Sequence, residues 1–121
     1  MTLKLKINMN FNDYETSISK LKLKVEQFME ERKWRRFHQP KNLAESICIE
    51  SAELMELFQW MGNDESYRWA VKPGNRVKVE EELADILIYI LSLANILKID
   101  LTSATLRKLE KDREKYPIDE I

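Results

Sequence analysis

The sequence predicts an all-α domain, a four-helix bundle that is completed by oligomerisation. Three observations support this fold class. Only 2 Gly and 3 Pro occur in 121 residues, so few positions interrupt long helices, and a turn-rich all-β fold is disfavoured. Apolar residues recur at helical spacing along most of the chain. Residues 83–97 are apolar on nearly every side, and such a helix must be buried on every side, which predicts that a second subunit covers it.

The N-terminal part of the chain has a different pattern. Residues 3–11 alternate between apolar and polar side chains, which is typical of a half-buried strand. A lone strand must pair with another copy, lie on a helix surface or be disordered. We therefore expect an N-terminal extension over residues 1–15 and one helical domain over residues 16–121.

The first two helices follow from their start and stop signals. The first is predicted from about Tyr14 to Lys33, with Asp13 or Thr16 as its cap. The second is predicted to begin after Asn42, where the residue three positions on would form a capping box. It should reach about Met61, before a Gly-Asn stop.

A connection over residues 62–76 separates these helices from the last two. It contains Pro73 and Gly74 and leaves room for one short helical turn. The third helix is predicted from about residue 77 to residue 97. The fourth should begin at Asp100 or Thr102 and end near residue 116, because Pro117 cannot continue it.

Composition excludes several classes of protein. Charged residues make up 34% of the chain, but its net charge is only −1, so no nucleic-acid partner is expected. A single cysteine, Cys48, excludes an internal disulfide framework and a cysteine zinc site, and favours a reducing, cytoplasmic setting. There is no signal peptide, and no apolar run reaches the roughly 18 residues of a membrane span, so no membrane partner is expected.

Two pairs of carboxylates stand out on the predicted helices. Glu50 and Glu53 lie three residues apart on the second helix, and Glu82 and Asp85 lie three apart on the third. Residues at this spacing are surface neighbours, so each pair projects two carboxylates in nearly one direction. They lie among core-forming apolar residues, where an acid is costly unless it is paired or binds a metal.

The type of ligand indicates the metal. Hard oxygen donors without His or Cys at ligand spacing favour Mg²⁺, which Mn²⁺ can replace. Because Mg²⁺ is usually completed by substrate phosphates, a polyphosphate is the natural partner. The alternative is that these acids lie on solvated faces and form surface pairs, and spacing alone leaves both interpretations open.

The acidic motifs resemble those of the MazG-like, all-α nucleotide pyrophosphohydrolase superfamily, and the chain is most similar to its dCTP pyrophosphatase branch. The signature of that superfamily is Glu-x-x-Glu followed by Glu-x-x-Asp, found here as Glu50-Ser-Ala-Glu53 and Glu82-Leu-Ala-Asp85 with 28 residues between them. The resemblance covers about residues 26–117, and it includes the segments 31–42, 53–60 and 81–89 and the Tyr-Pro ending of the last helix.

The resemblance implies roles for ten residues. The four acids would be the catalytic Mg²⁺ ligands. Residues that contact the substrate would be Trp34 and Trp60, flanking the base, His38 at the nucleoside, Tyr89 lining the pocket, and Lys108 and Arg113 facing the phosphates. Asp112 departs from the branch, which usually has Asn at that position.

The function implied is Mg²⁺-dependent hydrolysis of a nucleoside triphosphate, possibly dCTP-like, to monophosphate and pyrophosphate, a reaction that cleans the nucleotide pool. Two or more ions would bridge the carboxylates and the triphosphate, and Glu50 or Glu53 would serve as the base. Homodimers or homotetramers are expected. The alternatives are a non-catalytic helical interaction module, or a related all-α phosphohydrolase acting on dUTP or phosphoribosyl-ATP.

Overall fold

The computed structural model describes residues 11–118 and confirms the all-α class. Five α-helices and one 3₁₀ turn make up this part of the chain, and residues 11–118 contain no strand. They are α1 (Ile18–Glu31), the 3₁₀ turn η2 (Arg35–Phe37), α2 (Pro40–Glu56), α3 (Asn63–Ala70), α4 (Pro73–Leu97) and α5 (Leu101–Lys115). The predicted strand over residues 3–11 lies, apart from Phe11, outside the described residues.

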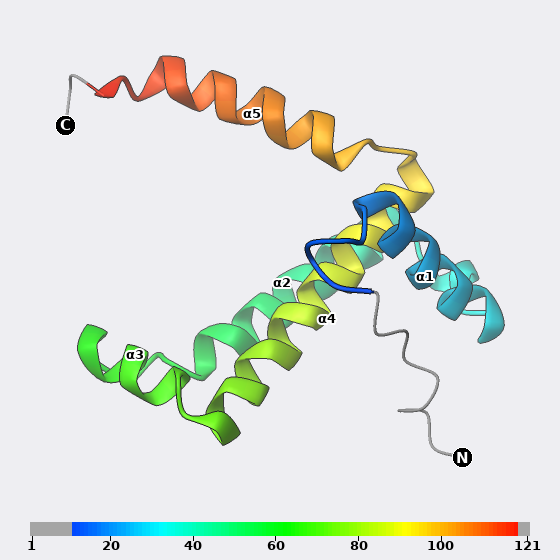
Figure 1. Ribbon diagram of the computed structural model, residues 1–121. Helices are drawn as coiled ribbons and strands as arrows, with labels where there is room; N and C mark the ends of the chain where they lie inside the picture. The colour runs from blue at the N-terminus through cyan, green and yellow to red at the C-terminus, as the bar shows by residue number, and fades with distance from the viewer. Residues whose placement is uncertain (1–10, 119–121) are drawn as a thin grey trace.

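The helices are arranged around the pair formed by α2 and α4 (Figure 1). These two helices lie side by side and antiparallel, α1 packs against the C-terminal part of α4, and α3 packs against the other end of α4. The helix α5 leaves the C-terminal end of α4, bent by 104°, and makes only marginal contacts with the other helices. By itself, no helix of residues 11–118 is long and apolar enough to cross a membrane.

Several helix boundaries differ from those predicted. The cap of α1 is Ser17, whose side chain accepts a hydrogen bond from the Lys20 N–H, 3.1 Å away, rather than Asp13 or Thr16. The hydroxyl of Thr16 accepts instead from the Asn12 N–H, in the turn before the helix. The helix α1 consequently spans a shorter range than residues 14–33.

The start of α2 was predicted three residues too late. Pro40 occupies its first turn, where a fixed φ and a missing N–H are tolerated. Asn42 lies inside the helix and donates to the Phe37 carbonyl, at 3.1 Å, so the predicted capping box is absent. The regular helix ends at Glu56, before the predicted end at Met61.

The connection over residues 62–76 is more helical than predicted. It forms α3, eight residues long, and the first turn of α4, which begins with Pro73 rather than at residue 77. The rings of Phe58 and Trp69 meet edge to face, 5.5 Å apart, and join α3 to the end of α2. The predicted cap of the last helix is confirmed, because Asp100 accepts from the Ser103 N–H at 3.0 Å.

The buried core of one chain is small. Val25, Met29 and Leu91 form its centre where α1 crosses α4, and Leu101 at the start of α5 packs against them. Large apolar side chains on α2, α4 and α5 are each at least 40% exposed: Ile49, Met55, Val77, Leu83, Leu87, Leu97, Leu106 and Leu109. Of the stretch of α4 that was predicted to be buried on every side, Leu91 and Ala94 are buried within one chain, but Leu83, Leu87 and Leu97 are not.

The accessible surface supports the same conclusion. The chain exposes 10217 Å². An unfolded chain of thirteen residues exposes about 2200 Å², so residues 11–118 account for at least roughly 8000 Å² of this area. A compact monomer of about 13 kDa would expose roughly 6300 Å². One chain thus exposes more surface than a compact monomer of its mass would, and much of this surface is apolar.

Candidate metal and nucleotide site

Three acids meet between α2 and α4. Oxygen atoms of Glu50, Glu53 and Glu82 all lie within 4.8 Å of one another. Glu50 is on the face of α2 that carries Leu43 and Leu54, because positions four and seven apart share a helix face. This face packs against α4, so the same apolar contacts that join the helices bring the acids together.

Two of these carboxylates have an oxygen that is shielded from solvent. The Oε2 atoms of Glu50 and Glu82 are both buried and have no hydrogen-bond partner in the described part of the chain. Among residues 11–118, no Lys, Arg or His forms an ion pair with Glu50, Glu53, Glu82 or Asp85. A shielded acid without a cation is unfavourable, and this is the environment that a bound cation would stabilise.

The electrostatics of the cluster agree with this geometry. Burial raises the pKa of Glu50 to about 7, and the hydrogen bond with Glu53 and the charges of Glu53, Asp85 and Glu82 raise it further. Burial and the charges of Glu53 and Asp85 also raise the pKa of Glu82. Asp85 is exposed and lies outside the three closest acids, but its negative charge reaches both.

The donor set fits a hard divalent cation. All of the candidate ligand atoms are carboxylate oxygens, which Mg²⁺ and Mn²⁺ prefer. Cys48, the only thiol in the sequence, is exposed on α2 and is not part of the cluster. Tyr89 lies one turn beyond Asp85 on α4, where it is half-buried. The structure thus brings the acids of both motifs to one place.

The aromatic residues predicted to flank the base lie at opposite ends of α2. Trp34 precedes the helix and Trp60 follows it. The 17 residues of α2 span about 25 Å, so one chain cannot place both rings on one base. Trp60, which is 89% exposed, is at the end of α2 nearer to Glu53.

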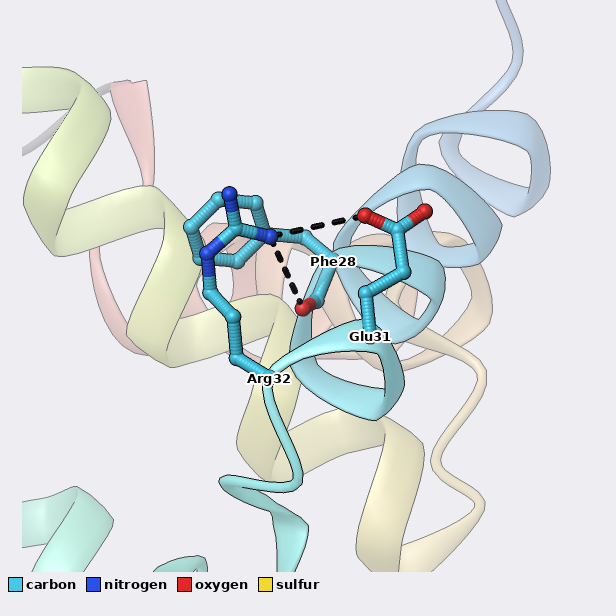
Figure 2. A network of polar contacts seen from close by, with 3 residues as sticks. All are labelled: Phe28, Glu31 and Arg32. Atoms are coloured by element: carbon cyan, nitrogen blue, oxygen red, sulfur yellow. Dashed lines mark hydrogen bonds and ion pairs between the residues drawn. The ribbon is translucent and has the colours of Figure 1, made fainter.

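Trp34 belongs to a separate cluster beside the end of α1, and His38 follows it in the link before α2. The Trp34 ring meets the Phe28 ring edge to face, 5.6 Å away, and the Arg32 guanidinium lies 3.7 Å from the centre of that ring. Figure 2 shows Arg32 also directed at the Phe28 carbonyl and at Glu31. Burial, and then the charge of Arg35, lower the pKa of His38, so its imidazole is neutral at pH 7.

The two cations expected at the phosphates are far from the acids of the same chain. Asp85 lies about 18 Å before the end of α4, and Lys108 about 10 Å beyond the start of α5. Because these helices are bent by 104°, Lys108 stays about 20 Å from Asp85, and Arg113 is more distant still. Figure 1 shows α5 running clear of α2 and α4.

Both cations are paired along α5 itself. Lys108 Nζ lies 2.7 Å from an oxygen of Asp112. Asp112, the residue that departs from the family pattern, is therefore paired with the lysine one turn before it. Arg113 pairs with Glu110. The pair with Glu110 was not predicted, although its i, i+3 spacing is a known signal for such contacts.

The comparisons with known proteins identify the family of this chain. The model of the MazG-like family matches residues 45–121, a range that holds all four acids. The chain belongs to the MazG-like family. It is 44% identical over 92 residues to dCTP pyrophosphatase 1 of Bos taurus, covering 76% of this chain and 54% of that protein. It is 42% identical over 91 residues to dCTP pyrophosphatase 1 of Homo sapiens, covering 75% and 54%.

This MazG-like chain spans about half the length of those relatives. It is also similar to a solved structure of a pyrophosphatase from Archaeoglobus fulgidus, with 40% identity and a TM-score of 0.78. That match covers 88% of this chain and 98% of the archaeal one. The fold of the MazG-like chain is therefore shared with nearly the whole of a solved chain.

The raised pKa of Glu50 predicts how the metal-free protein responds to pH. A carboxyl whose pKa rises on folding, here from 4.5 to about 7, binds its proton more readily in the folded chain. The free energy of unfolding is then highest below about pH 4.5 and falls as the pH rises through about 7. Melting temperatures measured in EDTA between pH 5 and pH 8 should show this fall.

Two variants isolate the contribution of Glu50. Glu50→Gln should flatten the fall, whereas Glu45→Gln, on an exposed and Lys41-paired position of the same helix, should retain it. The lowered pKa of His38 acts in the opposite direction in all three proteins and cancels in the comparison. An equal fall in Glu50→Gln would contradict the prediction.

Proposed function

We propose that this protein is a Mg²⁺-dependent nucleoside triphosphate pyrophosphohydrolase that releases a monophosphate and pyrophosphate, with a dCTP-like substrate. The observation that carries the proposal is the cluster of Glu50, Glu53 and Glu82, with two shielded oxygens and no cation partner among residues 11–118. The names of the relatives, dCTP pyrophosphatase 1 and pyrophosphatase, support the reaction class and suggest the nucleotide.

Each acid has a part in this proposal. Glu50, Glu53 and Glu82 would hold the cation. Asp85 would add a fourth carboxylate from the exposed side of the cluster. A bound Mg²⁺ compensates the charge of a triphosphate and lowers the pKa of a coordinated water. The chain itself positions the acids, since α2 and α4 hold them rigidly on two packed helices. Glu50 or Glu53 would accept the proton of the attacking water.

The nucleoside would lie toward the exposed aromatic residues. Trp60 presents nearly its whole ring to solvent at the end of α2, and stacking of a base on such a ring contributes about 1–3 kcal/mol. Tyr89 would line the pocket from α4 on the other side of the acids from Trp60, because α2 and α4 are antiparallel. Neutral His38 can accept or donate a hydrogen bond to a base or sugar, but it lies with Trp34 at the far end of α2.

A second copy of the chain would complete the site. One chain cannot bring Trp34, His38, Lys108 or Arg113 to its own acids, because the length of α2 and the bend before α5 keep them roughly 20 Å away. The same chain exposes a surplus of apolar surface on α2, α4 and α5. We therefore propose a homodimer or homotetramer in which α5 of one copy carries its cations toward the acids of another.

The first test concerns the metal and the products. Pyrophosphate release from dCTP should vanish in EDTA and return with Mg²⁺ or Mn²⁺, because four clustered acids would otherwise repel a triphosphate. Glu53→Gln and Asp85→Asn should each lower kcat at least roughly a hundredfold without loss of helical signal in circular dichroism. The exposed Glu45→Gln variant is the matched control and should keep wild-type activity.

The nucleotide panel in this test separates the alternatives. Full activity in EDTA would refute the metal site, and release of orthophosphate would refute the reaction. Faster turnover of dUTP or phosphoribosyl-ATP than of dCTP would show that dCTP is not the preferred substrate. Because the exposed apolar helices would also suit a non-catalytic interaction module, absence of turnover for every nucleotide would favour that alternative.

The second test asks whether two copies share one site. Glu53→Gln removes an acid, and Lys108→Ala combined with Arg113→Ala removes the cations of α5. Each protein alone should be nearly inactive at dCTP concentrations well below the wild-type KM, because loss of the cations weakens substrate binding. Co-expressed, they should recover about one quarter of the wild-type activity, because random pairing in a two-fold dimer leaves one intact site in each mixed pair.

The control for this experiment is a pair of variants that damage the same half of the site. Glu53→Gln co-expressed with Glu82→Gln should recover nothing, because every mixed pair then lacks an acid in both sites. Sedimentation should show a dimer or tetramer at micromolar concentration. A monodisperse active monomer, or no recovery in the mixed acid and cation variants, would show that each site belongs to one chain.

A further inference from the structure

The direction of α5 is set by the turn that joins it to α4. Beyond its first residue, α5 makes only marginal contacts with the other helices. Leu101 anchors it by packing against the cluster of Val25, Met29 and Leu91. Any group that fixes the backbone between the end of α4 and Leu101 therefore fixes where the whole helix points.

The end of α4 is shaped by a left-handed residue. Lys98 has φ 55° and ψ 45°, and the Ile99 N–H donates to the Ala94 carbonyl at 2.9 Å. These features turn the chain out of α4 within two residues. They leave the carbonyl of Ile99 outside the backbone hydrogen bonds of both helices, at the point where the chain turns toward α5.

Lys22 of α1 makes two hydrogen bonds to the end of α4 and the turn that follows it, one as a donor and one as an acceptor. Its Nζ donates to the Ile99 carbonyl at 2.7 Å, and its own carbonyl accepts from Asn95 Nδ2 at 3.0 Å. Asn95 is in the last turn of α4, so a single residue of α1 holds both sides of the bend. Lys22 and Asn95 are half-buried, and both line a cavity of about 890 Å³ between α1 and the bend.

The charge of Lys22 also reaches the cap of α5. Hydrogen bonds from Ser103 are the main reason that the pKa of the Asp100 carboxyl is lowered, and the Lys22 and Arg107 charges lower it further. The ammonium group of Lys22 therefore faces both the last carbonyl of the bend and the first acid of α5. No other lysine among residues 11–118 makes a hydrogen bond to this bend.

We propose that Lys22, together with Asn95, is a positioning residue that fixes the angle at which α5 leaves α4 and so places the cations of α5 at the acidic cluster of a second copy. This inference rests on the proposed function and on the proposed sharing of the site. The physical basis of the proposal is that a small change of angle at the start of a long helix displaces its far end by a large distance. Arg113 lies about 18 Å from the root of α5, so a swing of about 15° displaces it by roughly 5 Å, far beyond the tolerance of about 0.5 Å for a productive site.

The angle can be measured without reference to activity. Nitroxide labels at Lys78→Cys on α4 and Lys111→Cys on α5, both exposed positions, report the separation of the two helices by pulsed electron paramagnetic resonance. Cys48 is first replaced by Ser, and labelled chains are diluted with unlabelled ones so that distances within one chain dominate. Lys22→Met should broaden the distance distribution or shift it by several ångströms, for the same geometric reason.

Matched variants define the contribution of the hydrogen bond. Lys20→Met removes the same charge from the same helix and cavity wall, but its side chain has no hydrogen bond to the bend, so the distribution should stay as in the wild type. Lys22→Arg keeps a donor and should restore it. An unchanged distribution in Lys22→Met, with intact helical signal, would overturn the proposal.

Kinetics test the consequence for the site. Cations that bind the phosphates equally in the ground and transition states lower KM without changing kcat. Lys22→Met should therefore raise KM by roughly tenfold with little change in kcat, while Lys20→Met and Lys22→Arg should match the wild type. A shifted distance distribution with unchanged KM would overturn the positioning role. If the wild type releases no pyrophosphate, the proposed function fails, and the resonance measurement still decides whether Lys22 sets the angle.

Discussion

Four carboxylates lie between or beside α2 and α4, and the apolar side chains of these helices keep them there. Glu50 shares a face of α2 with Leu43 and Leu54, so the contacts that join the helices also force the acids together. The pKa of Glu50 rises to about 7 as a result. In the absence of a cation the helix pair is thus stabilised by its apolar contacts and destabilised by its acids. Cation binding would convert the second effect into a stabilising one.

The core of one chain is too small to bury all of its large apolar side chains. Val25, Met29 and Leu91 are buried where α1 meets α4, but α5 extends from this centre at 104°. The extension exposes Leu106 and Leu109, and it also carries Lys108 and Arg113 away from the acids of their own chain. The apolar surface that α5 leaves exposed and the distance between the cations and the acids therefore have one structural cause, which is the bend before α5.

Local patterns predicted the parts of the fold that depend on few residues. Helical spacing and the scarcity of Gly and Pro gave the all-α class, and Asp100 was recognisable as a cap because a short acceptor side chain precedes an apolar turn. The start of α4 was predicted too late because Pro73 was placed in the connection, although proline is favoured in a first turn, and Pro40 likewise occupies the first turn of α2. The helix α3 was missed because it is only eight residues long and begins at a Gly-Asn pair that was interpreted as a stop, and its contact through Trp69 is tertiary.

The site shows the same division between local and long-range information. The i, i+3 spacing placed Glu50 beside Glu53 and Glu82 beside Asp85, and the structure brings both pairs together. Spacing along one helix could not show that Trp34 and Trp60 lie about 25 Å apart, or that α5 turns away from the acids. That information resides in contacts such as Lys22 with Ile99, which join residues 77 positions apart.

If acids and cations of one site come from two copies, association and nucleotide binding are linked. A ligand that contacts both copies binds the assembled form more tightly than the single chain, so it must shift the equilibrium toward assembly by the same factor. The metal contributes to this linkage only through the acids of one chain, whereas the triphosphate spans both. The angle of α5 then affects both equilibria, because the helix that carries Lys108 and Arg113 also carries the exposed Leu106 and Leu109. A change at the bend would weaken assembly and substrate binding together, while a change confined to Lys108 would weaken substrate binding alone.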